Sequence, residues 1–224
     1  GAASSLYESN LPDSARRELA AEIVSESERM ERLITNLLDM TRLDAGGFPL
    51  KKEWHALDEI VGSALHALRK RLANHPVHTH LPLTLPLVRV DAAAVEQALI
   101  NLLDNAASYT PRGTPIDICI ACKADQLAIE VTDRGPGLPR EDPNRVFQKF
   151  FRGSHSVGHA DNGSRRGVGL GLAICKGIVE LHGGTISADN RPVAEGGGAL
   201  FRITLPTGGT PPMPPVETDM DVLQ

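Results

Sequence analysis

The longest regular pattern of apolar and polar positions lies near the start of the chain. Apolar residues recur there at alternating steps of three and four, which is typical of a helix whose one face packs against other helices. The stripe consists of Leu19, Ile23, Met30, Leu33, Leu37 and Met40, is widened by Ile34 and Leu38, and is interrupted at Glu26. Pro12–Ser14 supply a helix start with a cap, and Gly46–Gly47 supply a stop. We predict one helix over residues 11–47 that pairs with helices of another subunit; docking on its own domain is the alternative.

Shorter segments after the double glycine alternate between helical and strand-like patterns. Helical periodicity covers residues 57–74, about 91–108 and about 169–182. Strand-like patterns cover residues 48–54, 77–81, 87–90, 115–122, 126–132, 184–190 and 199–206. Residues 141–166 include a long polar run without periodicity and predict a loop, and the proline-rich, acidic residues 208–224 predict disorder. Helices and hairpin strands mixed in this way predict an α/β fold, a two-layer sandwich of a mixed sheet and helices.

Composition and charge narrow the possible partners. The chain has 224 residues, 41% of them hydrophobic, and a formal net charge of -5, so no overall basic field favours nucleic acid. No apolar run has the length of a membrane span, and no signal-peptide pattern opens the chain. We expect a soluble protein or the soluble part of a larger one.

Cysteine and histidine spacing gives little support for a metal site. Cys119 and Cys122 form a CxxC within a strand-like run, where residues three apart point to opposite faces. We interpret them as buried structural cysteines, and the odd total of three cysteines fits a reducing compartment. His78 and His80 could share a strand face, but no further ligand is evident near them.

Three segments carry candidate chemistry, and the first is the helix QALINLLDNAASY, residues 97–109. Asn101 and Asn105 are four residues apart, so they share one face, while leucines and alanine occupy the other. Two neighbouring amides suit a hard cation or a phosphate-bearing ligand, because each offers an oxygen without adding charge. Two exposed helical asparagines are the alternative reading.

The second segment is DRGPGLP, residues 133–139, which follows the strand-like run LAIEV. At the end of that strand, the Asp133 carboxylate can accept a hydrogen bond from an exocyclic amine. Gly135 and Gly137 let the backbone approach a planar base. A plain turn is the alternative, because glycine and proline mark turns of many kinds.

The third segment is RRGVGLGLAICKGIVELHGG, in which Gly167, Gly169 and Gly171 open a predicted helix. Backbone N–H groups at a glycine-rich helix start favour phosphate. The preceding strand and downstream acid of a dinucleotide-binding unit are missing, and a structural turn remains the alternative.

Taken together and in this order, these motifs resemble the conserved boxes of the sensor histidine kinases. That family belongs to the ATPase superfamily shared with gyrase B, MutL and Hsp90. The N box is NLLDNAASYTP, the G1 box DRGPGLP, the F box VFQKFFRGS and the G2 region GVGLGLAICKGIVELHGGTI. The resemblance covers about residues 1–206 and implies the histidine kinase/gyrase B/Hsp90-like ATPase fold, preceded by a long helix of a dimerisation hairpin.

The resemblance implies binding of ATP with Mg²⁺. Asp133 would bind the adenine amino group, and Gly135 and Gly137 would shape the base pocket. Asn105 would hold Mg²⁺ through the phosphates with Asn101 beside it, and these two asparagines are the implied catalytic residues. The remaining implied ATP-binding residues are Tyr109, Phe150, Arg152, Arg165, Arg166, Gly167, Gly169, Leu170 and Gly171. Phe150 and Phe151 would also anchor residues 152–166 as a lid.

Two departures from relatives affect the expected chemistry. The position three after Asn105, usually a lysine in the family, is Ser108 here, so one phosphate contact is lost and a lid arginine is a possible substitute. Gyrase-like ATPases carry a glutamate where this chain has Asn101. Because an amide cannot accept a proton from water at neutral pH, phosphoryl transfer to a protein is favoured over rapid hydrolysis.

A narrower resemblance is to the KdpD-type potassium-sensing kinases, carried by GAASSL, ERLITNLLDMTRLDAGGFPLKKEW and EIVGSAL. It implies a partial dimerisation and phosphoacceptor hairpin at 1–47, an ATP-binding catalytic domain at 48–207 and a disordered tail at 208–224. No histidine stands in the motif H-[E/D]-L-R-T-P, so we expect a fragment that binds ATP and cannot phosphorylate itself.

The same resemblance implies particular partners and a location. The expected partners are a KdpE-type response regulator and a second copy of the full-length kinase, with no nucleic acid and with membrane contact only through missing N-terminal regions. The expected location is the cytoplasmic part of an inner-membrane sensor. A nucleotide-binding regulator without transfer activity and an ATP-driven clamp of the MutL or Hsp90 type are the alternatives.

Overall fold

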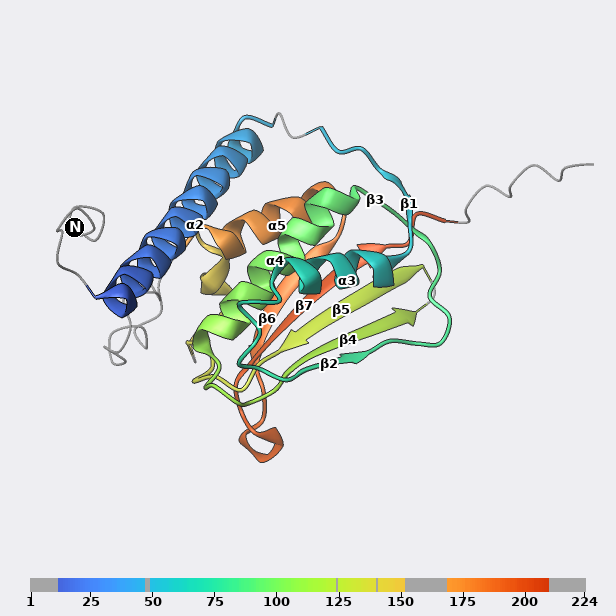
Figure 1. Ribbon diagram of the computed structural model, residues 1–224. Coiled ribbons are helices and arrows are strands. Elements are labelled where there is room, and N and C mark those ends of the chain that lie inside the picture. Colours follow the sequence, from blue (N-terminus) through green and yellow to red (C-terminus); the bar gives the residue numbers. More distant parts are fainter. Residues whose placement is uncertain (1–11, 47–48, 124, 140, 152–168, 210–224) are drawn as a thin grey trace, which may run out of the picture.

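A long helix stands beside a two-layer α/β unit in the computed structural model (Figure 1). The structure describes residues 12–46, 49–123, 125–139, 141–151 and 169–209. Helices cover one face of a twisted mixed sheet, as the sequence predicts for the fold class.

The sheet has five strands in the order β2-β4-β5-β7-β6. Their bounds are β2 Val77–His80, β4 Ile116–Lys123, β5 Gln126–Thr132, β6 Thr185–Asn190 and β7 Ala199–Pro206. β2 runs parallel to β4, and every other neighbouring pair is antiparallel. Ile116, Ile118 and Ile120 alternate with more exposed residues along β4, so one face of the sheet supplies the core.

Two predicted elements are shorter than the sequence pattern suggested. The strand predicted at 48–54 is reduced to β1, Glu53–His55, because its partner β3, Val88–Val90, is equally short and the two form a separate ribbon. The helix predicted at 57–74 ends early as α3, Leu57–Ala67. Turns follow it, yet Leu68 and Leu72 remain buried, which explains why the apolar pattern continues beyond the helix.

The helix α4, Ala92–Tyr109, lies between α3 and α5, Gly171–Leu181 (Figure 1). Asp91 caps it, since the Asp91 Oδ1 accepts from the Ala94 N–H at 3.1 Å. The apolar side predicted for this helix is buried in the core and consists of Leu99, Leu102, Leu103 and Ala106. The opposite edge is left to polar side chains.

The long helix α2, Asp13–Asp44, confirms the predicted element but lacks the predicted cap. Pro12 occupies the N-cap position, and no side-chain hydrogen bond from the described part of the chain caps the helix. Among the described residues, it is the last turns of α2 that pack on the α/β unit, through the buried Met40 and through Leu43, which lies against Gly177 of α5. Docking on its own domain therefore accounts for only one end of the apolar stripe.

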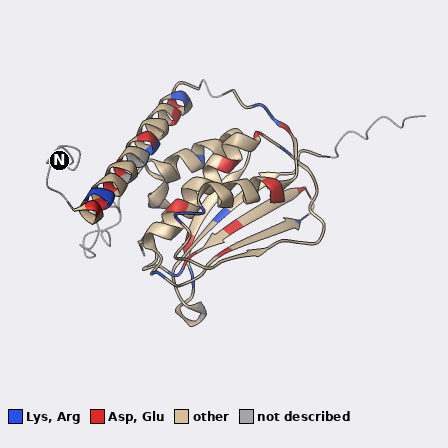
Figure 2. Ribbon diagram, viewed as in Figure 1, with Lys and Arg blue, Asp and Glu red and all other residues tan. Residues whose placement is uncertain are grey.

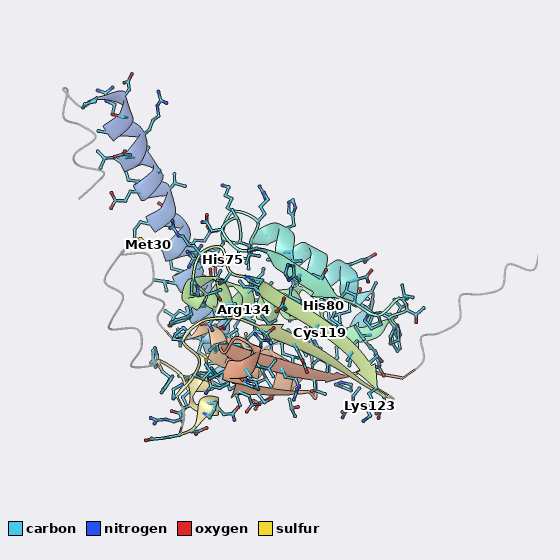
Figure 3. All side chains as sticks on the ribbon, turned by 90° about the horizontal axis from the view of Figure 1, so that it is seen from below. Met30, His75, His80, Cys119, Lys123 and Arg134 are labelled. Atoms are coloured by element: carbon cyan, nitrogen blue, oxygen red, sulfur yellow. The ribbon has the colours of Figure 1, made fainter. Side chains whose placement is uncertain are left out.

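The prediction that Cys119 and Cys122 are buried is wrong. Cys175 is buried, but Cys119 is half-buried and Cys122 is exposed because β4 leaves the core toward its end. His80 pairs with Cys119 across the β2–β4 edge, where Figure 3 labels both. Among the residues that the structure describes, no group of three or more His, Cys, Asp or Glu side chains could hold a metal ion.

Candidate functional site

The polar edge of α4 carries the two asparagines predicted from the sequence. Asn101 and Asn105 are both half-buried. The Asn101 Oδ1 accepts weakly from the Gln97 side chain at 3.5 Å, whereas its Nδ2 is buried with no hydrogen-bond partner in the described part of the chain. Within the same residues, the Asn105 side chain makes no hydrogen bond. Both amides therefore keep capacity for a ligand.

Asp133 lies directly after β5 with only 3% of its surface exposed. Its Oδ1 accepts from the N–H of Gly135 at 2.7 Å and of Ala199 at 3.0 Å. Oδ2 has no partner among the described residues and remains available to a donor. Burial raises the pKa of the Asp133 carboxyl, and the hydrogen bonds from Ala199 and Gly135 offset only part of that rise.

Glycine at 135 and 137 is required by close packing. A side chain at Gly135 would place its first carbon 2.9 Å from the Tyr109 carbonyl oxygen, so this glycine brings the loop against the end of α4. Gly137 has a φ of 81°, and a side chain there would meet Asn190. The loop therefore depends on the absence of side chains, as predicted, although no base is needed to explain the requirement.

Two further residues hold this loop and were missed by the sequence reasoning. Asn190, at the end of β6, accepts from the Leu138 N–H at 2.6 Å and donates to the Leu138 carbonyl at 3.1 Å. Gly198 packs directly against the Asp133 backbone, where a side chain would clash. The sequence offered only the turn residues around 190–198 as a signal, because both contacts join distant segments.

The start of α5 differs from the predicted glycine-rich opening. The helix begins at Gly171, while Gly169 precedes it with a φ of 78° and Gly167 lies outside the described residues. The first intrahelical bond runs from the Ile174 N–H to the Leu170 carbonyl, and no side chain of the described residues caps the helix. The N–H groups of the first turn are consequently free to bind an anion.

The buried phenylalanine of the F-box segment is Phe147, whereas the lid that Phe150 and Phe151 are predicted to anchor lies outside the described residues. Phe147, in the 3₁₀ helix Pro143–Phe147, is buried and packs edge-on against Phe201 with ring centroids 6.3 Å apart. The Phe150 side chain is 63% exposed, and it anchors through its backbone, because its N–H donates to the Gly169 carbonyl at 3.0 Å. The Arg145 guanidinium lies over the Phe151 ring, with its central carbon 5.4 Å from the ring centroid.

The remaining predicted site residues divide into three groups. Arg152, Arg165 and Arg166 lie outside the described residues, as does most of the predicted lid. The side chain of Leu170 is buried in the core, so only its backbone borders the site. Tyr109 is partly exposed at the end of α4, and its backbone touches the Gly135 turn.

Close contacts bring the three sequence motifs together around α4. Gly135 packs against Tyr109, and a side chain at Gly171 would lie 3.5 Å from the Asn101 Oδ1. Gly169 packs against the Phe151 carbonyl, which joins the F-box segment to the start of α5. One neighbourhood therefore holds a buried carboxylate, two amides with spare capacity and free helix N–H groups.

Residues 90–209 match the family model described as Histidine kinase-, DNA gyrase B-, and HSP90-like ATPase. The chain belongs to this family. Its fold and the neighbourhood of the three motifs agree with that membership, and the predicted family resemblance is confirmed.

Individual relatives place the chain among histidine kinases. It is 45% identical over 90% of its length to the sensor protein KdpD of Escherichia coli, and 38% identical over 92% to KdpD of Clostridium acetobutylicum. The chain spans about a fifth of the length of these relatives, 21% and 22%. A solved structure of the mycobacterial sensor histidine kinase MprB matches with a TM-score of 0.61 at 30% identity, covering 71% of this chain and 99% of that one.

The helices give no indication of a membrane segment. Of those that the structure describes, none combines the length and the apolar character needed to cross a bilayer.

Proposed function

We propose that this domain transfers the γ-phosphate of ATP to a histidine outside the chain, and from there to an aspartate of a response regulator. The observation that carries the proposal is the packing of Gly135 on Tyr109 and of Gly171 on Asn101. These contacts set a base-binding loop and a phosphate-binding helix start on the same polar edge of α4.

The adenine end is assigned to the loop 133–139. Asp133 uses Oδ1 to hold the loop and keeps Oδ2 for the adenine amino group. Since Gly135 has no side chain, a flat base can approach the backbone closely. A buried carboxylate that accepts from the base discriminates against bases that present an acceptor there.

The phosphate end is assigned to α4 and to the start of α5. The orphan Nδ2 of Asn101 and the unpaired amide of Asn105 fit phosphate oxygens and a hydrated Mg²⁺, so the residues present agree with the implied metal. When bound, Mg²⁺ neutralises charge on the phosphates. The free N–H groups from Gly171 onward would hold phosphate oxygens.

Transfer is favoured over hydrolysis because Asn101 cannot act as a base toward water. This is also the residue that disfavours the clamp alternative, in which a glutamate would be needed at this position. A regulator that binds nucleotide without transfer stays as the second candidate, because Ser108 carries no positive charge at a position where relatives use lysine.

The long helix supports a proposed pairing with other helices. Ile34, Leu37 and Leu38 on α2 are each more than half exposed, which suits one helix of a dimerisation and phosphoacceptor hairpin. We assign this hairpin to residues 1–47, the catalytic domain to 48–207 and a tail to 208–224. A KdpE-type response regulator, potassium or osmotic sensing and an inner-membrane parent protein rest on the KdpD resemblance.

The test combines binding with transfer. Calorimetric titration of the wild-type chain with a non-hydrolysable ATP analogue should show binding that Mg²⁺ strengthens, and Asn105→Ala should remove most of the Mg²⁺ effect. Labelled ATP is then added with a separate hairpin that carries an acceptor histidine. Labelling of the hairpin supports the kinase, whereas binding without labelling supports the regulator, and no binding at all rejects both.

A further inference from the structure

A positive charge does reach the Ser108 position, from a segment far away in the sequence. Asn101, Asn105 and Ser108 lie along one edge of α4 at helical spacing. Arg71 belongs to the turns after α3, and its Nη2 donates to the Ser108 Oγ at 2.8 Å. A lysine at 108 would repel this guanidinium, whereas a serine hydroxyl accepts from it.

The Arg71 guanidinium is fixed on a second side as well. Its Nε donates to the Asp104 Oδ1 at 2.9 Å, and the Ser108 hydroxyl in turn donates to the Asp104 carbonyl at 2.7 Å. Two anchored nitrogens fix the plane of the guanidinium and reduce its loss of freedom on binding. The side chain is 34% exposed, and Nη1 has no partner among the described residues. Three N–H donors are therefore left over, two on Nη1 and one on Nη2.

We propose that Arg71 is a binding residue for the polyphosphate of the nucleotide, held in position by Ser108 and Asp104. The assignment rests on the proposed function, because it needs ATP on this edge of α4. A guanidinium with a spare donor suits phosphate oxygens, and partial burial strengthens the contact relative to a fully solvated charge. Arg134, labelled in Figure 3, is by contrast held by the Asp117 carboxylate and the Pro115 carbonyl, to both of which its Nη1 donates.

The test compares nucleotides with and without phosphates. Arg71→Gln removes the charge and keeps a chain of similar shape. Binding of ATP and ADP, measured by calorimetry, should weaken by about tenfold or more, while binding of adenosine stays within about twofold. The ratio of adenosine to ATP dissociation constants is the decisive quantity, because a general loss of folded protein does not change it.

Matched variants separate charge from structure. Arg69→Gln changes an exposed arginine two residues away that bonds only to His66 among the described residues, and it should leave the ratio unchanged. The double variant Arg71→Gln with Ser108→Lys returns a cation to the same edge and should restore the ratio. Thermal unfolding of each variant reports separately on folding.

Failure of this assignment differs from failure of the proposed function. If the wild-type chain binds ATP and Arg71→Gln keeps the wild-type ratio, Arg71 has only a structural role and the assignment is wrong. A reduced ratio that Ser108→Lys does not restore also overturns it, since charge on that edge would then not be the cause. Absence of ATP binding by the wild-type chain instead rejects the proposed function itself.

Discussion

The helices α2 and α4 both carry an apolar stripe, yet the two stripes differ in how far the structure buries them. The stripe of α4 is buried by α3, α5 and the sheet, and Leu102 has no exposed surface. Half of the residues of the α2 stripe are exposed, with Leu37 at 55%, and among the described residues its last turns are the part that packs on the α/β unit. Figure 2 shows charges of both signs along α2, which keep its remaining surface polar.

This difference in burial shows which structural features a hydrophobic pattern specifies. Periodicity predicts that a helix forms and which face is apolar, but it does not identify what covers that face. In α4 other elements of the same chain bury the apolar face, and the polar edge stays accessible to a ligand. In α2 the described residues leave half of the stripe exposed, and the proposed function gives its cover to other helices of a kinase dimer.

The largest expected effect comes from truncating a buried leucine of α4, and it is compared with the same truncation of an exposed leucine of α2. Leu102→Ala should lower the free energy of unfolding by about 2–5 kcal/mol, because it leaves a cavity in a fully buried site. Leu37→Ala should change it by less than about 0.5 kcal/mol in dilute protein. Denaturant unfolding measures both. Equal losses would mean that the α2 stripe is already covered.

A second prediction concerns the site that the polar edge of α4 shares with the loop 133–139. The raised pKa of Asp133 means that the fold disfavours its ionised form, so the neutral amide of Asp133→Asn should not lower stability in the absence of nucleotide. The same variant should weaken ATP binding by about 1–3 kcal/mol, because the amide N–H would face the adenine amino group, and two donors cannot pair.

Calorimetry and thermal unfolding of Asp133→Asn check the two halves of that expectation. The exposed Asp189, two strands away from β5, gives the control Asp189→Asn, which should alter neither quantity much. Unchanged ATP affinity in Asp133→Asn would place the base elsewhere.

A third prediction concerns how stability depends on pH through His182, which follows α5 and bonds to Asp91 at the start of α4. The buried His182 accepts from the Asp91 N–H at 3.0 Å through Nε2, and its Nδ1 faces the Ile178 carbonyl at 2.8 Å, so the neutral ring fits. Burial lowers the pKa of His182, with Lys52 adding to the effect. Because the fold then binds the proton less well than the unfolded chain, stability should fall as pH drops below about 6.5, the ordinary histidine value.

The control for this pH effect replaces the ring with an amide. His182→Gln can keep both hydrogen bonds and cannot take up a proton, so its stability should depend less on pH between 7 and about 5 than that of the wild type. His66→Gln, at an exposed site, should retain the wild-type slope. Parallel slopes in the wild type and His182→Gln would assign the dependence to other groups.

The smallest expected effect lies where the two regions meet. Asp44 at the end of α2 pairs with Lys149 at 2.6 Å, and both side chains are about half exposed, 56% and 45%. A double-mutant cycle with Asp44→Asn and Lys149→Gln should give about 0–1 kcal/mol at low salt and less at high salt. A coupling that survives high salt would indicate that the α2 contact is more buried than this surface pair suggests.

The local elements and the residue types of the site could be predicted from the sequence. The Asp91 cap, the buried side of α4 and the hairpin strands β4 and β5 follow from short-range capping and periodicity. The motif order also predicted which segments meet, because family resemblance carries tertiary information that spacing does not. Phe147 shows the limit of that resemblance, since it is buried against Phe201 and the motif did not single it out.

The sequence by itself determined which segments form helices or strands, though not all their ends, and which amides, carboxylate and glycines are available. Only the tertiary structure decided the parallel pairing of β2 with β4, the hydrogen bond between Asn190 and Leu138, and the hydrogen bond from Arg71 to Ser108. The physical reason is that these contacts join residues tens of positions apart. Their geometry depends on how whole elements pack, whereas caps and periodic faces depend only on near neighbours.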